Sequence, residues 1–384
     1  MIIIKILNNI FNIIFIPKLL SDFFSNISLI KNKKKIFIHD SGGFGHNFLF
    51  PDIIRMTNKK EEFLYIQFFE KKRHNDYLPL IFDINFLLLN YEVDIHFFKK
   101  TFFLGKTENT NEVLLISILK FLLKVTNFNN KIVTINQFYD DLVNNFNYEN
   151  YKSLISPYSI KQFKSLKISK GLIVHQHYFD LLIKNKKALS REYFSNSYPK
   201  LIDLIFKKND RNLTFYIRLK GNEYIEDLYR NGSNPSVYIN ILKYLIQKGF
   251  QITLIGDWDL IKDIKFKKFI ELNKNILNYK KSNCEKKLFD ILCLLNTNYF
   301  IGEHGGAQYF ANYIERSIII NAFPIGQKLS KINMFYKKIY DKSKNIYIED
   351  TYQYRYIYDF SDNIEIKSLN TNEIIEFIES KLFK

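Results

Sequence analysis

The sequence predicts an α/β protein with two domains, each built on a parallel sheet that helices cover on both faces. Short β-branched strand segments alternate with helical segments along the chain, which is the pattern of a parallel sheet. Two glycine-rich loops, at residues 41–46 and 301–308, each follow a strand and precede a helix. A length of 384 residues is sufficient for two separate cores. We therefore expect a ligand in a cleft between two domains.

Five strands and two helices are predicted in the first half of the chain. The strands are short apolar runs at residues 35–40, 62–69, 93–98, 131–138 and 171–178. Helices are expected over residues 46–56 and 114–125. A polar stretch at residues 185–210 is typical of a linker, so we place the first domain at residues 35–195.

The second half shows the same alternation in a cleaner form. Pro235 begins a helix that Gly249 ends, because proline fits the first helical turn and glycine the position after the last. The other predicted elements are strands at residues 213–220, 250–257, 299–303 and 317–323, and helices at 286–295, 308–314 and 373–382. We place the second domain at residues 205–365 and expect a closing helix, within residues 370–384, to pack back toward the first domain.

Residues 1–34 form an apolar segment followed by a basic linker. Lys5, Lys18 and several asparagines interrupt the apolar run, which disfavours a membrane-spanning helix, and no small-residue cleavage site indicates a signal peptide. The apolar residues recur at helical spacing, which favours a helix lying on the inner face of a membrane. A helix packed on the protein's own body and a true membrane span are the alternatives.

The formal net charge of +17 comes almost entirely from lysine, since the chain has only eight arginines. A solvated lysine surface explains this charge, and attraction to an anionic membrane leaflet is the main alternative. We expect no nucleic-acid partner, because no helix-turn-helix, zinc-finger or aromatic–basic RNA motif is present. The two cysteines, Cys284 and Cys293, have neither disulfide nor zinc spacing, which fits a reducing compartment.

The glycine-rich loop of the second half is the most informative motif. Glu303, His304, Gly305 and Gly306 stand between a predicted strand and a predicted helix. Glycine lets the backbone approach a ligand, and the start of a helix offers unpaired N–H groups to an anion. Glu303 and His304 can hydrogen-bond a sugar or a base, or transfer a proton. The alternative is that His304 caps the following helix and Glu303 is exposed on the surface.

Two arginines, an asparagine and an aspartate extend this candidate donor site. Arg218 lies in an apolar strand, where a buried guanidinium needs an anion, so we predict that it binds a diphosphate at the carboxyl edge of the sheet. A structural salt bridge is the alternative for Arg218. Arg230 and Asn231 follow in a polar loop, and Asp257 is expected to line the same crevice.

The loop in the first half carries the candidate acceptor site. Gly43 and Gly45 allow a close backbone approach, and His46 follows them directly. Imidazole titrates near neutrality, so His46 can be the general base that deprotonates an acceptor hydroxyl. Asp40, at the end of the preceding strand, is the rival base. His46 can equally be a residue at a helix start with a local hydrogen bond.

We expect no metal site. Asp257 and Asp259 form an Asp-x-Asp pattern that can hold a divalent cation, but so short a pattern occurs often by chance. His175 and His177 would share one face of the strand predicted at residues 171–178, which is a weak indication of a metal site.

In this order and spacing, several pieces of the sequence resemble a family of bacterial surface-carbohydrate glycosyltransferases, which build polysaccharide or lipopolysaccharide, with a GT-B-like fold. They are Gly45-His46, the segment 215–219 around Arg218, Arg230-Asn231 with Tyr238, the segment 244–257, and the segments 289–306 and 318–324. The resemblance covers residues 210–325 well. It implies two Rossmann-like domains facing across a cleft, with a nucleotide-sugar donor in the second and the acceptor in the first.

The resemblance also implies the reaction. A sugar passes from a nucleotide-activated donor to a glycan or lipid-linked acceptor of the cell envelope, with no required cofactor, at the cytoplasmic face of the membrane. In fucosyltransferase-type GT-B enzymes an arginine in such a strand contacts the nucleotide diphosphate, and this role carries over to Arg218. Two other classes remain open, namely a GT-B-shaped transferase with a non-nucleotide donor, for example a pyruvyl transferase, and a non-catalytic membrane-surface protein.

Overall fold

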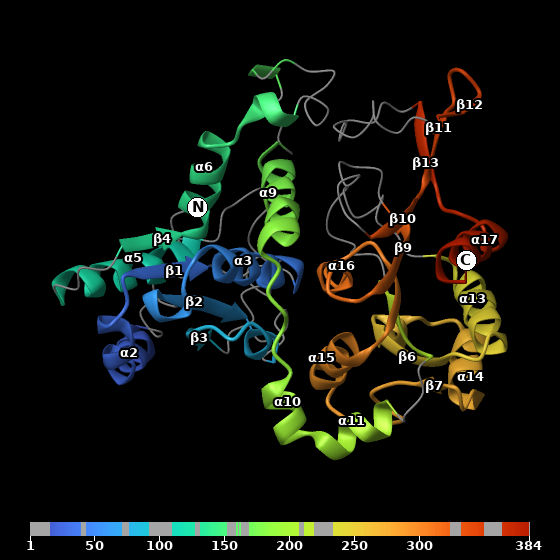
Figure 1. Ribbon diagram of the computed structural model, residues 1–384, viewed down its shortest axis with the longest axis horizontal. Coiled ribbons are helices and arrows are strands. Elements are labelled where there is room, and N and C mark those ends of the chain that lie inside the picture. The colour runs from blue at the N-terminus through green and yellow to red at the C-terminus, as the bar shows by residue number, and fades with distance from the viewer. Residues whose placement is uncertain are drawn as a thin grey trace, which may run out of the picture. The chain divides into compact units, whose positions relative to one another are not determined.

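The fold is taken from a computed structural model of the chain (Figure 1). The structure describes residues 16–39, 44–70, 77–91, 110–126, 131–151, 159, 161–162, 169–206, 211–218, 233–322, 332–348 and 363–383. By its internal contacts the chain divides into two compact units, Met1–Asn144 and Asn145–Lys384, and each is described by itself.

The first unit contains a four-stranded parallel sheet in the order β3-β2-β1-β4. Its strands are β1 Lys35–His39, β2 Phe63–Glu70, β3 Phe86–Tyr91 and β4 Lys131–Thr134. The prediction of strands near residues 35–40 and 62–69 is confirmed by β1 and β2. The predicted strand at residues 93–98 lies outside the described residues, and β3 precedes it.

Helices flank this sheet. They are α2 Ile27–Lys31, α3 Phe44–Thr57, α5 Thr110–Val125 and α6 Ile135–Asn144, with short 3-10 helices η1 Lys60–Glu62 and η2 Leu78–Ile81. Residues 16–25 are also helical. Leu19 and Phe23 from that helix are buried in one cluster with Ile36 of β1 and Leu64 of β2. For residues 16–25, the structure therefore supports a helix packed on the protein's own body.

Two elements in this part of the chain differ from the sequence expectation. The strand expected over residues 131–138 ends at Thr134, because Thr134 and Gln137 form a capping box that starts α6. The Gln137 side-chain oxygen accepts from the Thr134 N–H at 3.0 Å and from its Oγ1 at 3.1 Å, while the Gln137 N–H donates to Thr134 Oγ1. This reciprocal pattern satisfies backbone donors at a helix start and leaves no room for a longer strand.

The strand expected over residues 171–178 is wrong, since these residues lie within α9 Ser169–Asn185. The apolar positions Ile173, Val174, Tyr178 and Leu181 are buried, and this spacing fits one face of a helix rather than the alternation of a strand. A short run rich in β-branched residues does not distinguish a helix from a strand when it is read alone.

The second unit is built on a six-stranded parallel sheet in the order β10-β9-β8-β5-β6-β7. Its strands are β5 Asn212–Ile217, β6 Gln251–Gly256, β7 Ile276–Leu277, β8 Tyr299–Glu303, β9 Arg316–Ala322 and β10 Asn333–Tyr336. A small antiparallel sheet follows, in the order β12-β11-β13, from β11 Lys338–Asp341, β12 Ile346–Ile348 and β13 Ile364–Lys367. The helices are η3 Tyr148–Tyr151, α9, α10 Glu192–Ser197, α11 Pro199–Ile205, α13 Pro235–Gln247, η4 Trp258–Leu260, α14 Ile264–Leu272, α15 Lys286–Asn296, α16 Gln308–Ala311 and α17 Thr371–Leu382.

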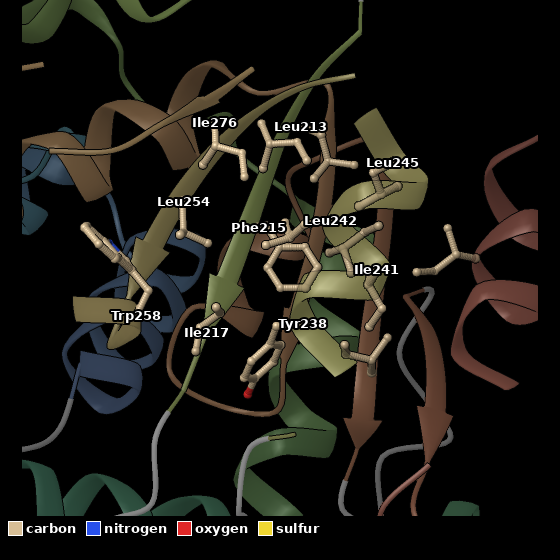
Figure 2. Close-up of a cluster of buried hydrophobic side chains, with 14 of the residues drawn as sticks. Leu213, Phe215, Ile217, Tyr238, Ile241, Leu242, Leu245, Leu254, Trp258 and Ile276 are labelled. Atoms are coloured by element: carbon tan, nitrogen blue, oxygen red, sulfur yellow. The ribbon is translucent and has the colours of Figure 1, made fainter. Parts of the chain in front are cut away.

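Helices lie on both faces of this larger sheet. Phe215 and Ile217 of β5 point into a core that α13, α14 and α17 cover, and Figure 2 shows Tyr238 of α13 beside them. Thr214, which points to the opposite face, donates a hydrogen bond from its hydroxyl to the Cys293 carbonyl of α15 at 3.3 Å. The alternation of β5 side chains therefore fixes which helices cover which face.

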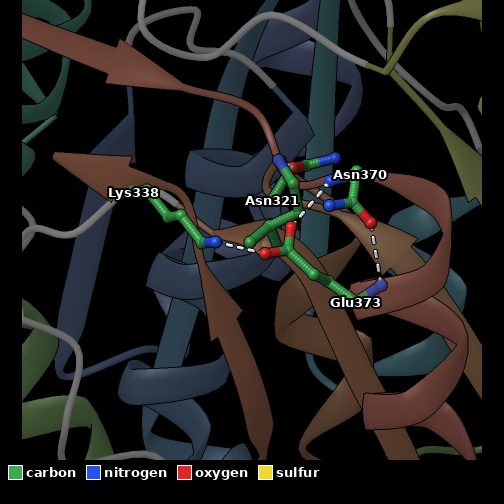
Figure 3. A network of polar contacts seen from close by, with 5 residues as sticks. Asn321, Lys338, Asn370 and Glu373 are labelled. Carbon is green, nitrogen blue, oxygen red and sulfur yellow. Dashed lines mark hydrogen bonds and ion pairs between the residues drawn. The ribbon is translucent and has the colours of Figure 1, made fainter. Parts of the chain in front are cut away.

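The closing helix α17 belongs to the core of the second unit. Ile374, Ile378 and Leu382 recur at helical spacing and are buried with α13 and the sheet. Asn370 and Glu373 form a capping box at its start, and Lys338 of β11 is paired with Glu373 (Figure 3). The apolar face that we expected to pack toward the first domain is thus buried within the second unit.

These two parallel sheets confirm the predicted α/β fold class. Within the described ranges, every helix is too short or too polar to cross a bilayer.

Candidate functional site

The connections of the larger sheet single out one point along its carboxyl edge. From β5 the chain continues outward through β6 to β7, and it later returns on the other side of β5 as β8, β9 and β10. The direction of winding therefore reverses between β5 and β8. In doubly wound sheets, ligands bind outside the carboxyl ends of the strands at such a point. Arg218 directly follows β5, and the loop from His304 to Gly306 directly follows β8.

Arg218 contacts that loop. Its side chain is partly buried, and its Nη1 donates a hydrogen bond to the carbonyl oxygen of His304 at 3.1 Å. The structure therefore brings together two of the residues that the sequence singled out, which lie 86 positions apart in the chain. A guanidinium carries five N–H donors in a planar fork, which is the geometry that binds a phosphate.

Glu303, the last residue of β8, is only 2% exposed. Its Oε1 accepts hydrogen bonds from the N–H and the hydroxyl of Ser233 at 2.7 and 3.0 Å, and its Oε2 accepts from the Tyr238 hydroxyl at 2.6 Å. Burial raises the pKa of Glu303, while the bonds from Tyr238 and Ser233 act in the opposite direction. The alternative of an exposed surface glutamate is therefore wrong.

The Glu303 contacts extend into a wider polar network. Asn321, at the end of β9, donates from Nδ2 to the Ser233 hydroxyl at 2.5 Å and accepts from the Leu369 N–H at 3.1 Å. Asn321 has a positive φ of 49°, a conformation that asparagine tolerates better than most residues. The network thus joins the ends of β8 and β9 to the segment that starts α13 and to the segment that starts α17.

Lys337 is a buried cation that sequence reasoning missed. It follows β10, is 3% exposed, and its N–H donates to the Ala322 carbonyl at the end of β9 at 2.9 Å. Burial lowers the pKa of Lys337 to about 8; the charge of Glu303 opposes this shift and that of Arg218 adds to it. These three groups are therefore close enough to interact, and when all are ionised they carry a net charge of +1. In a chain so rich in lysine, nothing in the sequence marks Lys337.

Three glycines at this edge lie against Tyr216 of β5. A Cβ on Gly256 would lie 2.8 Å from the Tyr216 ring, one on Gly302 would lie 2.9 Å from the Tyr216 Cβ, and one on Gly305 would lie 2.8 Å from its hydroxyl. Gly256 also has a φ of +85°, which L side chains rarely adopt. We expected the glycines to let the backbone approach a ligand; for Gly305 the structure shows that the adjacent space is occupied by Tyr216.

Two aspartates, Asp257 and Asp290, act electrostatically on Tyr216. Asp257 follows β6, and its N–H donates to the Ile217 carbonyl at 2.8 Å. Asp290 lies on α15, where burial raises its pKa to about 8; Lys286 counteracts this shift, while Asp257 adds to it. Asp290 is therefore mainly protonated and neutral at pH 7.

The second acid of the Asp-x-Asp pattern has other partners. Asp259 is paired with Lys286 at 2.8 Å and accepts a hydrogen bond from the Tyr279 hydroxyl at 3.1 Å. Among the residues that the structure describes, no group of three or more His, Cys, Asp or Glu side chains is placed to hold a metal ion.

The two histidines of α9 do not share a face. Residues two apart on a helix point in different directions, so the expectation based on a strand at residues 171–178 is wrong for His175 and His177. His175 instead stacks on Tyr309 of α16, with ring centroids 5.7 Å apart and an interplanar angle of 2°. Burial lowers the pKa of His177.

Several predicted site residues cannot be placed. Asp40, Gly43, Arg230 and Asn231 lie outside the described residues, as does the side chain of His46. The backbone of Gly45 and His46 lies in the first turn of α3.

Residues on either side of the candidate acceptor loop form a buried polar layer in the first unit. His39, which ends β1, has its Nδ1 2.6 Å from the Tyr65 hydroxyl of β2. Gln67 of β2 donates to Asn47 of α3 at 2.5 Å. All four side chains are buried, so the carboxyl ends of β1 and β2 are fixed to each other and to the helix that follows the loop.

Comparison with known proteins gives similarity in fold. No family model and no curated protein matches the sequence. A glycosyl transferase family 9 protein from Veillonella parvula DSM 2008 is similar in structure, with a TM-score of 0.52 and 8% identity over 91% of this chain and 98% of that one. This similarity shows that the chain shares the fold of that glycosyltransferase, and the expected GT-B-like architecture is confirmed.

Two further solved structures align with lower scores. A UDP-GlcNAc 2-epimerase from Neisseria meningitidis, bound to UDP-GlcNAc, has a TM-score of 0.37 and 10% identity, over 75% of this chain and 83% of that one. The E. coli ADP-heptose lps heptosyltransferase II has a TM-score of 0.35 and 11% identity, over 90% of this chain and 99% of that one.

Proposed function

We propose that this protein is a glycosyltransferase that moves a sugar from a nucleotide-activated donor to a hydroxyl of a surface glycan or lipid-linked acceptor. The observation that carries the proposal is the position of Arg218. Arg218 directly follows the central strand β5 of the larger sheet, beside the loop after β8, where the winding of the sheet reverses. The fold shared with a glycosyl transferase family 9 protein supports the same reaction class.

In the proposed reaction, negative charge builds on the diphosphate as the sugar leaves. A fixed cation and backbone N–H groups aimed at that charge lower the barrier, because they need no reorganisation during the reaction. Arg218 supplies the cation, and the amides around Gly305 and Gly306 supply the N–H donors. Arg218 thereby takes the part that a divalent cation has in other glycosyltransferases, and no metal or other cofactor is required.

The remaining donor contacts follow from the same edge of the sheet. His304 recognises the sugar or the nucleotide, with Arg230, Asn231 and Asp257 as further contacts. Glu303 has both oxygens bonded to Ser233 and Tyr238, so we assign it to positioning the loop rather than to proton transfer.

The acceptor belongs to the first unit in this proposal. His46, in the first turn of α3, or Asp40, which follows β1 in the sequence, removes the proton of the acceptor hydroxyl. Residues 1–15 would hold the enzyme at the inner face of the membrane, where a lipid-linked acceptor is available.

A binding screen tests the proposal. Calorimetry with UDP, GDP, ADP and CMP, and with the corresponding nucleotide sugars, should identify one nucleotide that binds. That nucleoside diphosphate or monophosphate should also be the product that is released on transfer. In R218A the affinity should fall about 10- to 150-fold, because one charge-assisted contact is worth about 1.5–3 kcal/mol. Arg316, which bonds the Tyr299 hydroxyl at the opposite edge of the sheet, offers the matched control R316A with unchanged affinity. Unchanged affinity in R218A would overturn the assignment of Arg218.

A further inference from the structure

The side chain of Tyr216 shares its surroundings with Arg218. Tyr216 is paired with Ile255 of β6 and with Gly302 of β8, so it lies on the central strand beside the reversal point. A Cβ placed on Gly305 would lie 2.8 Å from the Tyr216 hydroxyl and 3.0 Å from the Arg218 Cδ. The phenol hydroxyl and the arginine side chain therefore border the same backbone atom of the loop after β8.

The Tyr216 hydroxyl differs from the other tyrosine hydroxyl at this edge. Tyr238 is fully buried, and its hydroxyl both donates to Glu303 and accepts from the Ser233 N–H at 2.8 Å. Tyr216 is partly exposed, and within the described part of the chain its hydroxyl forms no hydrogen bond. A polar group held rigidly by its neighbours but without a protein partner is available to a ligand.

The hydroxyl is a donor at any physiological pH. Burial raises the pKa of Tyr216, the charge of Asp257 raises it further, and Arg218 counteracts both. The group therefore stays protonated and offers an O–H, which an oxygen acceptor on a ligand can use.

Charges of both signs surround this O–H. Arg218 and Lys337 are cations, and Glu303 is engaged by Ser233 and Tyr238. Asp290, which faces Tyr216 from α15, is mainly neutral at pH 7 because its pKa is about 8. Asp257 is the remaining acid on this side. At the Tyr216 hydroxyl the Asp257 carboxylate has a larger effect than the Arg218 guanidinium, and Arg218 is the cation that borders Gly305 together with the hydroxyl. An anionic ligand bound by Arg218 at this loop would therefore lie beside the hydroxyl.

We propose that Tyr216 is a ligand-binding residue of the donor site, whose hydroxyl donates a hydrogen bond to a phosphate oxygen of the nucleoside diphosphate that Arg218 binds. This inference rests on the proposed function and extends it, since it adds a neutral donor to the anion site. It also gives Gly305 a purpose, because the atom nearest to a Cβ at that position would be the Tyr216 hydroxyl.

The test is a calorimetric titration of the full-length protein with the nucleoside diphosphate that the wild type binds best among UDP, GDP, ADP and CDP. In Y216F the affinity should fall about tenfold or more, since a hydrogen bond to a charged group is lost. The melting temperature should not fall, because the hydroxyl has no protein partner to lose. Tyr299 at the opposite edge of the sheet provides the matched control Y299F, which should bind like the wild type.

A second variant checks the placement of the hydroxyl by stability alone. Gly305→Ala should lower the melting temperature through the contact with Tyr216, and the same change in a Y216F background should lower it less.

The outcomes separate the two proposals. If Y216F binds within about twofold of the wild type while R218A loses binding, the role of Tyr216 is wrong and the proposed donor site stands. If the folded wild type binds none of the nucleotides, both proposals are wrong. Equal decreases in melting temperature for Gly305→Ala in the wild-type and Y216F backgrounds would show that the Tyr216 hydroxyl does not lie beside Gly305.

Discussion

At the scale of single residues, the candidate site is defined by groups whose charge depends on burial. Lys337 and Asp290 both have a pKa of about 8, the lysine lowered and the aspartic acid raised, because burial disfavours the charged form of each. At pH 7 the lysine is mainly charged and the acid mainly neutral, so both favour an anion nearby. As the pH rises, the titration of Lys337 and the titration of Asp290 therefore both weaken the binding of an anion.

The affinity for a nucleoside diphosphate should fall as the pH rises from 7 to 9. Lys337 loses its positive charge and Asp290 gains a negative one across this range, while the phosphate groups, with a second pKa of about 6, are already ionised. We expect a loss of about tenfold, measured by calorimetry at constant ionic strength.

Asp290→Asn provides the control for this pH dependence, because it keeps the neutral form at every pH and should make the decrease shallower. An affinity that stays constant or rises between pH 7 and 9 would contradict the charge assignment.

At the scale of elements, one hydrogen-bond network fixes the loop after β8 to the start of α13. Glu303 ends β8, and its carboxylate takes three hydrogen bonds from Ser233 and Tyr238. Asn321 extends the network to β9. These contacts join elements that are far apart in the chain, so the network is tertiary rather than local. It holds the end of β8 in place, and with it His304, which Arg218 contacts.

Tyr238→Phe should lower the free energy of unfolding by about 1–3 kcal/mol, since it leaves a buried carboxylate oxygen and the Ser233 N–H without one of their partners. Chemical denaturation measures the effect. Tyr279 also donates to a carboxylate, that of Asp259, but it is only partly buried, so the control Y279F should cost less than about 1 kcal/mol. Equal losses in the free energy of unfolding for Y238F and Y279F would show that burial of the Glu303 network adds no stability.

At the scale of the whole molecule, the chain consists of two compact units with separate hydrophobic clusters. The N-terminal residues divide by role. Leu19 and Phe23 are buried in the cluster of the first unit, whereas residues 1–15 lie outside the described part of the structure. The apolar segment read as one unit in the sequence therefore has at least one part, residues 16–25, that serves the core.

Removing residues 1–15 should abolish binding to vesicles that contain anionic lipid and leave the melting temperature unchanged. Removing residues 1–25 should also destabilise the first unit by several kcal/mol, because it deletes two buried apolar side chains, each worth about 1.5–3 kcal/mol. Vesicle sedimentation and thermal melting measure the two effects. Vesicle binding that survives the shorter deletion would assign the membrane contact to the lysine-rich surface instead.

The α/β class, the strands β5, β6, β8 and β9, the helices α13, α15 and α17, and the position of the glycine loop with Glu303 and His304 could be predicted from the sequence. These features depend on local patterns, namely apolar periodicity, Pro235 at a helix start and glycines between elements. Arg218 stood out because a charge within an apolar strand is unusual. Local patterns failed where two structures compete for the same apolar run, as in α9, and where the Thr134–Gln137 capping box ends a strand early.

The surroundings of the site depend on tertiary contacts. Glu303 belongs to a buried network because the partners Ser233 and Tyr238 approach it from 65 to 70 positions away. Lys337 and Asp290 acquire their shifted pKa values from burial, which the packing of distant elements produces. Gly256, Gly302 and Gly305 all contact Tyr216 because β6 and β8 pair with β5 on either side of it. A sequence pattern records the type and order of residues, whereas burial and proximity arise only when the sheet assembles.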